Sequence, residues 1–308
     1  LNRLVFASRT DSVCRQMFSG VYTALVTPFK KGRLDEASLK NLVNLQVKGG
    51  VDGIVPVGTT GESPTVDFEE HVRIIELAVY YAKGQCKVIA GSGANSTEEA
   101  VYLTKSAEYA GADGSLQVSP YYNKPSQEGL YAHFSEIAKS TNLPIILYSI
   151  PGRCNVEIGV NTVSRLATDC PNIRCIKEAG GDADRVSQLR AVLPKSFTIL
   201  SGDDALTLPF MSVGAQGVIS VASNLLPKQL TKMVHSYLKG DHKAALKLHE
   251  KYYPLFKDLF LETNPVPVKA ALAMKGLVKE EYRLPLVKMH LDNRRRLRRT
   301  LKSVGVIK

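Results

Sequence analysis

The chain is poor in cysteine and in long apolar runs. Only five of its 308 residues are cysteines, and none stands in a CxxC pair or at the spacing of a metal-ligand set. This usage argues against a disulfide framework and favours a reducing compartment. No apolar run approaches the ~20 residues that span a bilayer, so no membrane association is expected. The sequence also lacks a GxGxxG or P-loop motif, the usual signatures of nucleotide binding.

Positive charge is concentrated at the two ends of the chain. Of a net charge of +11, residues 1–16 carry +2 and residues 288–308 carry +7, which leaves about +2 for the body. We interpret Arg294–Arg299 as a solvated or interfacial helix face, with a patch for RNA or another anion as the alternative. Residues 1–16 begin without Met and precede Met17. They predict an extension outside the fold. It is either an over-extended start in a cytoplasmic protein or the remnant of a transit peptide. A transit peptide would place the protein in the plastid stroma.

From Gly20 onward, apolar runs and helical patterns alternate about every thirty residues. Ser96 and Ser126 each precede acidic residues where a helix N-cap is expected. The runs predict eight strands: Val21–Val26, Gly53–Val57, Lys87–Ala90, Ser115–Val118, Ile145–Tyr148, Arg174–Ile176, Phe197–Leu200 and Gly217–Val221. Continuous apolar strands that alternate with helices indicate a parallel sheet covered on its faces. Eight such units predict an α/β fold, a (β/α)₈ TIM barrel over residues 17–225.

After residue 225 the strand pattern stops. The helical patterns that follow are Lys228–Leu238, His242–Leu261, Val266–Met274 and Pro285–Leu301. They predict a C-terminal helical subdomain over residues 226–308 that packs against the barrel.

Several candidate functional residues stand at the carboxyl ends of predicted strands, where barrels of this kind place their chemistry. Lys177 follows one apolar run, and a desolvated lysine amine can attack a carbonyl to give a Schiff base. Tyr148 ends an earlier run and is soon followed by Arg153; a phenol can relay protons, and a guanidinium can bind a carboxylate. Thr59 and Thr60 belong to a GTTGE stretch that either binds an anion or forms a tight turn.

The order of these motifs resembles a known family. The stretches GTTGE (58–62), SPYYNKPSQEGLYAHF (119–134), LYSIPGR (147–153), IKEAGG (176–181) and SGDD (201–204) are similar to those of the pyruvate-dependent, Schiff-base-forming aldolases. The likeness runs from about Met17 to at least Met274, and its C-terminal part includes the segment Pro265–Lys269. Within the family it is strongest to the branch that condenses pyruvate with L-aspartate 4-semialdehyde, the first committed step of diaminopimelate and lysine biosynthesis.

The resemblance implies roles for individual residues. Lys177 would form the imine with pyruvate, Tyr148 would transfer protons, and Arg153 would bind the carboxylate of the aldehyde. Gly202 and Ile219 would contribute backbone carbonyls near the lysine. No metal or organic cofactor is implied, because the lysine imine is itself the electron sink.

The resemblance also implies an oligomer. Thr59 and Thr60 would hold the pyruvate carboxylate, and Thr60 would link Tyr148 to Tyr122 in a proton relay. In the family this second tyrosine reaches in from the neighbouring subunit, so at least a dimer and usually a tetramer is implied.

A feedback site for L-lysine is implied at the dimer interface. The matching positions are Ser63, His71, Asn95, Glu99 and Tyr121, with Phe68 where a histidine or an aromatic residue is common. Glu99 is the informative one, because its carboxylate can pair with the effector's ammonium, although an acid in the first turn of a helix is also favoured by the helix dipole.

Two alternatives remain open from the sequence. N-acetylneuraminate lyase or another keto-acid aldolase would share the imine chemistry, and Arg153 argues against it because the sugar-acid members lack this arginine. A catalytically silent barrel that binds nucleic acid through Arg294–Arg299 would form no imine. The chain departs from the family pattern at Ser149 and at Cys154-Asn155, beside the residue expected to select the aldehyde.

Overall fold

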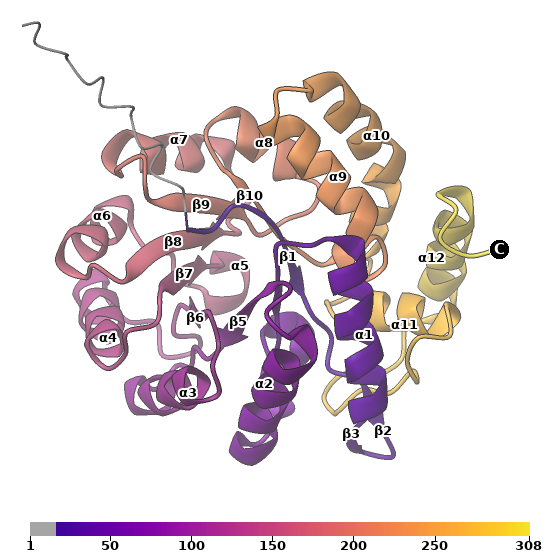
Figure 1. Ribbon diagram of the computed structural model, residues 1–308, viewed down its shortest axis with the longest axis horizontal. Helices are drawn as coiled ribbons and strands as arrows, with labels where there is room; N and C mark the ends of the chain where they lie inside the picture. Colours follow the sequence, from indigo (N-terminus) through magenta and orange to yellow (C-terminus); the bar gives the residue numbers. More distant parts are fainter. Residues whose placement is uncertain (1–16) are drawn as a thin grey trace, which may run out of the picture.

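Eight parallel strands close into a barrel in the computed structural model, which describes residues 17–308. The extension expected over residues 1–16 lies outside the described residues. Around the barrel the strand order is β1-β10-β9-β8-β7-β6-β5-β4 (Figure 1). The strands are β1 (Gly20–Ala24), β4 (Gly53–Val55), β5 (Lys87–Gly91), β6 (Gly114–Val118), β7 (Ile145–Ser149), β8 (Ile173–Glu178), β9 (Thr198–Ser201) and β10 (Gly217–Ser220). Each predicted strand overlaps one of these, and the (β/α)₈ fold is confirmed.

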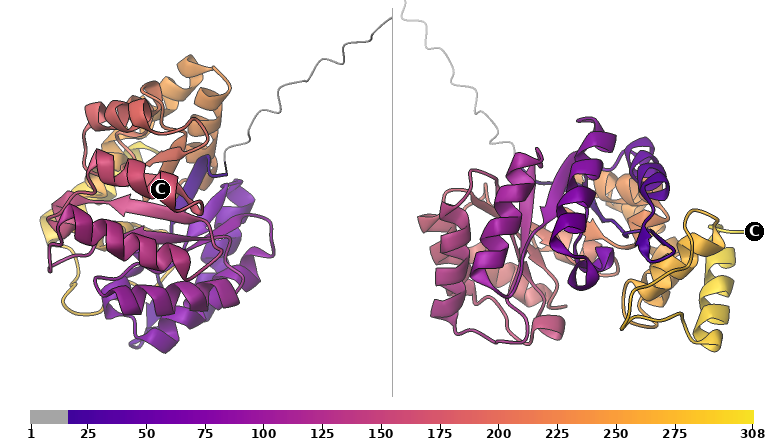
Figure 2. Two further views of the ribbon diagram at one scale, coloured as in Figure 1. Left: turned by 90° about the vertical axis from the view of Figure 1, so that its left-hand side faces the viewer. Right: turned by 90° about the horizontal axis from the view of Figure 1, so that it is seen from below.

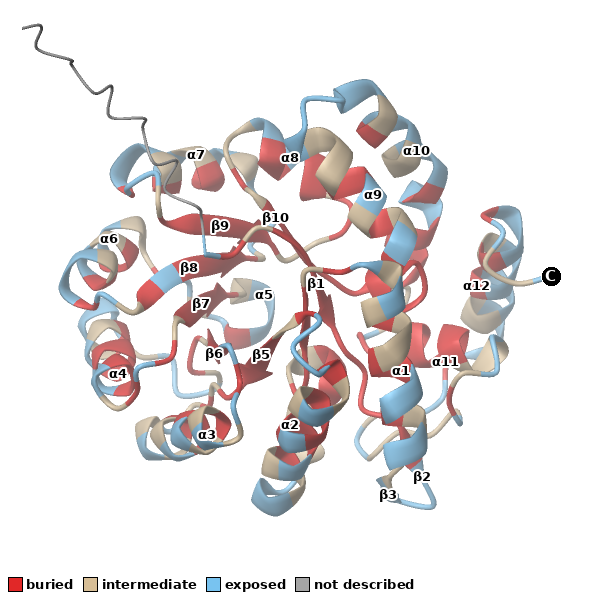
Figure 3. Ribbon diagram, viewed as in Figure 1, coloured by how far each residue is buried: buried red, intermediate tan, exposed pale blue. Residues whose placement is uncertain are grey.

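Helices surround the barrel, with their exposed faces outward (Figure 3). They are α1 (Glu36–Gly49), α2 (Phe68–Ala82), α3 (Thr97–Tyr109), α4 (Gln127–Lys139), α6 (Val160–Asp169), α7 (Ala183–Val192), α8 (Thr207–Ser212) and α9 (Pro227–Leu238). Ser96 and Ser126 cap α3 and α4 by accepting hydrogen bonds from backbone N–H groups, as predicted. Two features were not predicted from the sequence: the short hairpin of β2 (Phe29–Lys30) and β3 (Arg33–Leu34), and the single-turn helix α5 (Pro151–Cys154).

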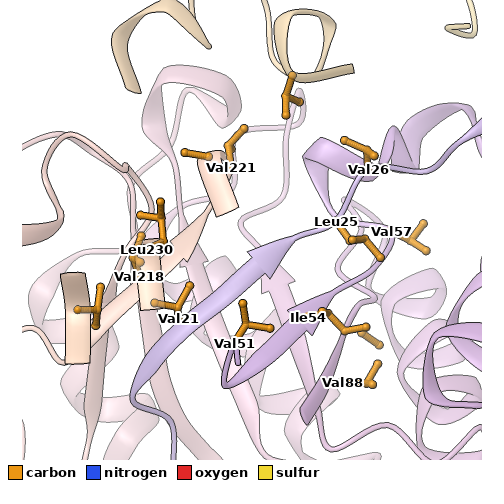
Figure 4. Packing of buried hydrophobic residues seen from close by; sticks show 14 of the residues in the cluster. Val21, Leu25, Val26, Val51, Ile54, Val57, Val88, Val218, Val221 and Leu230 are labelled. Atoms are coloured by element: carbon orange, nitrogen blue, oxygen red, sulfur yellow. The ribbon is translucent and has the colours of Figure 1, made fainter. Parts of the chain in front are cut away.

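The pleat of the strands sorts their side chains into two cores, because successive residues face opposite sides of a sheet. In β1, Val21 faces the helices, where it belongs to the outer cluster with Ile54 and Val218 of neighbouring strands and Leu230 of α9 (Figure 4). The inner cluster takes one or more buried residues from every barrel strand: Tyr22, Ala24, Val55, Ile89, Leu116, Ile146, Tyr148, Cys175, Leu200 and Ile219, together with Phe18. The barrel interior is therefore filled, and ligands have access only at its ends.

Three further helices follow the ring: α10 (His242–Asp258), α11 (Val266–Met274) and α12 (Leu291–Ser303). Helices α11 and α12 lie together at one side of the barrel (Figures 1 and 2), whereas α9 packs against β1 and α1. The prediction that the last helix starts at Pro285 is wrong, because the helix begins at Leu291, where the side chain of His290 accepts a hydrogen bond from the N–H of Asp292. The division of the chain at residue 225 stays a prediction.

Helix α12 carries the arginine cluster. Its apolar face is buried through Leu297 and Leu301. Arg296 bonds to the carboxylate of Asp258, and Arg294 forms an ion pair with Glu280. Part of the positive charge of the cluster is therefore neutralised within the chain. This agrees with the interpretation of Arg294–Arg299 as a solvated or interfacial helix face. Within residues 17–308, no helix combines the length and apolarity needed to cross a membrane.

A histidine–aspartate pair at the amino-terminal end of the barrel should make stability depend on pH. Asp52 accepts hydrogen bonds from the N–H of Val21 and from Nε2 of His235, both at 2.8 Å. The hydrogen bond to Asp52 raises the pKa of His235 above 6.5. Because the folded state holds this proton more tightly, the pair stabilises the fold fully below about pH 6.5, and the contribution is lost as pH rises through the folded pKa.

We expect His235→Gln, which cannot titrate, to reveal this contribution. The melting temperature of the native protein should exceed that of the variant most at about pH 5.5, and the difference should shrink by about pH 8.5. Both side chains are about one-third exposed, so the effect should stay below about 1 kcal/mol. A difference that grows with pH would contradict this assignment.

Candidate active site

Lys177 and Tyr148 lie side by side at the carboxyl end of the barrel. They are register partners in the β7–β8 pair, and each is two residues beyond an inward-facing residue, Cys175 and Ile146 respectively. The same pleat therefore turns both side chains inward. Only 6% of Lys177 is exposed, and its Nζ lies 3.9 Å from the ring centroid of Tyr148. A buried primary amine thus sits against the face of a phenol.

The GTTGE stretch folds into a 3-10 turn, η1 (Thr59–Gly61), shortly after β4. Glu62 ends the turn in the left-handed conformation, with φ of 58°. Thr60 is buried, and its Oγ1 accepts a hydrogen bond of 2.9 Å from Nδ2 of Asn264. Thr59 lines a small cavity together with Gly58 and Tyr148. The motif is a tight turn and also brings one hydroxyl-bearing residue into the same cavity as Tyr148.

Arg153 lies on α5, which in Figure 1 sits inside the ring of outer helices beside β7. With Thr59, Tyr121 and Cys154 it lines a cavity of about 230 Å³. Nη2 of Arg153 donates a 3.0 Å hydrogen bond to the backbone carbonyl of Asn264, and this contact fixes the guanidinium. Burial raises the pKa of Cys154 to about 11, so its thiol stays protonated at neutral pH.

The other predicted catalytic and substrate-binding residues are more scattered. Gly202 lies beside the lysine strand, where its N–H donates a 2.7 Å hydrogen bond to the carbonyl of Glu178. Ile219 is fully buried in the inner cluster. Tyr122 is 91% exposed, with φ of 74°. A single chain therefore leaves this tyrosine outside the cavity that holds Thr59 and Tyr148.

The six residues predicted to bind an effector lie together. Ser63, Phe68, His71, Asn95, Glu99 and Tyr121 all line one cavity of about 490 Å³. Burial lowers the pKa of His71 to about 4, so the ring is neutral, and its Nε2 contacts the carbonyl of Gly91 at 2.8 Å. Burial, followed by the charge of Glu99, raises the pKa of Tyr121. The cavity thus offers the carboxylates of Glu99 and Asp67 among neutral polar groups.

Asn264 and Lys269 were not predicted as site residues from the sequence. Asn264 contacts both Thr60 and Arg153, and Lys269 forms a fully buried ion pair with Glu62 at 2.5 Å. The only signal was their place in or next to the Pro265–Lys269 segment, which resembles the family but carries no chemistry of its own in the sequence.

Comparison with known proteins identifies the family. The Dihydrodipicolinate synthetase family matches residues 17–304. The 4-hydroxy-tetrahydrodipicolinate synthase of Persephonella marina is 52% identical over 95% of this chain and 100% of its own length. The solved 4-hydroxy-tetrahydrodipicolinate synthase of Methylacidiphilum fumariolicum is 56% identical, covers 94% of this chain and 96% of its own, and superposes with a TM-score of 0.93. The enzyme of Cyanidioschyzon merolae, solved with lysine bound, is 40% identical over 94% of this chain and 99% of its own, with a TM-score of 0.92. These matches confirm the aldolase branch expected from the motifs, and the chain belongs to the dihydrodipicolinate synthetase family of pyruvate-dependent lyases.

Proposed function

We propose that the protein condenses pyruvate with L-aspartate 4-semialdehyde to give 4-hydroxy-tetrahydrodipicolinate. Nζ of Lys177 attacks the ketone carbon of pyruvate, water leaves, and an imine forms. Loss of a methyl proton gives the enamine, whose carbon attacks the aldehyde. The amine of the second substrate then displaces Lys177 as the ring closes, which frees the enzyme.

The placement of Lys177 against Tyr148 carries this proposal. The amine is almost fully buried and lies at the mouth of a barrel whose interior is otherwise filled. Thr59 and Tyr148 line one cavity, and Thr59 also lines the cavity of Arg153, which suits a small aldehyde that bears a carboxylate. Family membership supports the same pair of substrates.

The direct test is pyruvate consumption with aspartate semialdehyde and, separately, with N-acetylmannosamine. Consumption with the semialdehyde alone supports the proposed synthase. Consumption with the sugar alone would move the enzyme to the N-acetylneuraminate lyase branch and leave Arg153 without a role. No consumption with either would favour a silent barrel.

We further propose that Tyr122 acts in the active site of a neighbouring subunit, in a dimer or a tetramer. Its ring is almost fully exposed in the single chain, so it is accessible to a neighbouring subunit. Tyr122→Phe should lower kcat by about 10-fold or more while the oligomer stays intact, because the ring remains and only the proton-relaying hydroxyl is lost. Steady-state kinetics and sedimentation measure the two effects, and unchanged turnover would make Tyr122 a packing residue.

The cavity lined by the six effector residues is proposed to bind L-lysine as a feedback inhibitor. Glu99 supplies a carboxylate for an ammonium group, and the cavity shares Ser63 and Tyr121 with the cavity of Arg153. The relative from Cyanidioschyzon merolae was solved with lysine bound, which supports an effector of this kind.

Glu99→Gln should weaken inhibition by L-lysine by about 10- to 100-fold, because a charge-assisted hydrogen bond becomes a neutral one. The matched control is Glu98→Gln on the same turn of α3, whose side chain does not line this cavity. Dose–response curves of turnover against L-lysine measure both. Equal inhibition of the two variants would remove Glu99 from the effector site.

A further inference from the structure

We propose that Asn264 is a positioning residue that sets the direction of the hydrogen bond at Thr60 and anchors Arg153. The inference rests on the proposed function, because it assigns Asn264 a role through these two residues. Asn264 precedes α11, more than 200 positions after Thr60 in the chain, and only 6% of it is exposed.

The side chain of Asn264 determines what the Thr60 hydroxyl can do. A threonine hydroxyl has one hydrogen to donate and two lone pairs that accept. Nδ2 of Asn264 donates to Oγ1 at 2.9 Å and so occupies one lone pair. The hydroxyl hydrogen remains free to point at another acceptor, which a proton relay between two tyrosines requires.

The main chain of Asn264 contacts Arg153, the residue proposed to bind the second substrate. Its carbonyl accepts a 3.0 Å hydrogen bond from Nη2 of Arg153. A guanidinium has five N–H donors, so this contact orients the group and leaves other donors for a carboxylate. The side chain and the main chain of one residue therefore serve different steps, and a side-chain substitution separates them.

The surroundings hold Asn264 rigidly. Lys269, one turn into α11, forms the buried pair with Glu62, two residues after Thr60. The backbone N–H of Arg283 donates to the other oxygen of Glu62 at 3.2 Å. Oδ1 of Asn264 is itself buried without a hydrogen-bond partner. An unsatisfied buried acceptor costs stability, and a functional role is one explanation for such a group.

Asn264→Asp tests the proposal, because it is nearly isosteric and replaces the donor with an acceptor. At neutral pH the hydroxyl of Thr60 must turn to donate to the carboxylate, and kcat should fall by about 10- to 100-fold relative to the native enzyme at the same pH. As pH falls through the pKa of the introduced carboxyl, its protonated form can donate again, and the ratio of variant to native kcat should rise. KM for the aldehyde should change by less than about 3-fold, because the carbonyl that holds Arg153 is unaltered.

Asn172→Asp is the matched control. Nδ2 of Asn172 donates to the carbonyls of Ala138 and Thr141 at 2.9 and 3.0 Å, just before β8 and away from the carboxyl ends of the strands. This variant should lose thermal stability but keep a kcat ratio that does not vary with pH. If Asn264→Asp fails to fold, Asn264→Ala should still lower kcat with little change in KM, and its loss should not depend on pH.

Borohydride trapping of pyruvate, measured by mass spectrometry, distinguishes failure of the proposed function from failure of the role of Asn264. If the native enzyme forms no adduct at Lys177, the proposed function fails and the role of Asn264 fails with it. If the native enzyme forms the adduct but the kcat ratio of Asn264→Asp is near one, or is low and flat with pH, Asn264 is merely structural. An adduct together with a ratio that recovers at low pH supports the proposal.

Discussion

Lys177→Ala is expected to abolish the borohydride-trapped pyruvate adduct and to lower turnover by about 10⁴-fold or more. A reaction that proceeds through a covalent intermediate has no other route of similar rate once its nucleophile is removed. The lysine has no carboxylate partner among the described ion pairs, and its nearest described contact is the ring of Tyr148. The fold should therefore survive the loss of this side chain.

The matched control is Lys87→Ala, which removes a lysine from the start of β5, at the opposite end of the barrel. Adduct formation and turnover should persist in this control. Intact-mass spectrometry and far-UV circular dichroism on both variants complete the comparison. A persistent adduct in Lys177→Ala would overturn the assignment of the nucleophile.

Lys269→Met is expected to cause the largest loss of stability. Lys269 and Glu62 are almost completely buried, with side-chain exposures of 0% and 1%. Burial lowers the pKa of Lys269, and Glu62 opposes that shift. Removal of the lysine leaves a buried carboxylate without its cation, which costs about 3–5 kcal/mol, or roughly 6–20 °C in melting temperature.

Two comparisons isolate the charge effect. Lys275→Met, at the end of the same helix, removes an exposed lysine whose Nζ donates to the Leu225 carbonyl, and it should cost about 1 kcal/mol. The double variant Glu62→Gln with Lys269→Met removes both charges and should recover part of the lost melting temperature, because no unpaired charge remains. A single variant as stable as the Lys275 control would show that the pair contributes little.

The regular elements could be predicted because their signals are local. Apolar runs between helical patterns located all eight strands, and hydroxyl side chains before acidic turns located the caps of α3 and α4. The single turn of α5 was missed because four residues carry no helical period. The start of α12 was placed too early because Pro285 resembles a first-turn proline.

The candidate site was predictable only where it follows the strand ends. Lys177 and Tyr148 each stand one residue before the end of a strand, and Thr59 lies in the turn that follows β4. The carboxyl ends of parallel strands lie at one face of the barrel. Asn264 reaches the site from the turn before α11, outside the barrel, across more than 200 positions of sequence. A contact between residues so far apart leaves no local pattern in the sequence from which it could be predicted. The role of each site residue stays a prediction until the variants are measured.

The contacts between the two ends of the chain constrain the order in which a new molecule matures. β1 pairs with β10, so the barrel cannot close until Ser220 has been synthesised. The partners of Thr60 and Glu62 come later still, at Asn264, Lys269 and Arg283. A ribosome paused after residue 225 would hold every barrel strand and Lys177, yet Thr60 and Glu62 would lack these partners. Catalytic competence should therefore appear only near the end of translation, which keeps an unfinished chain from consuming pyruvate.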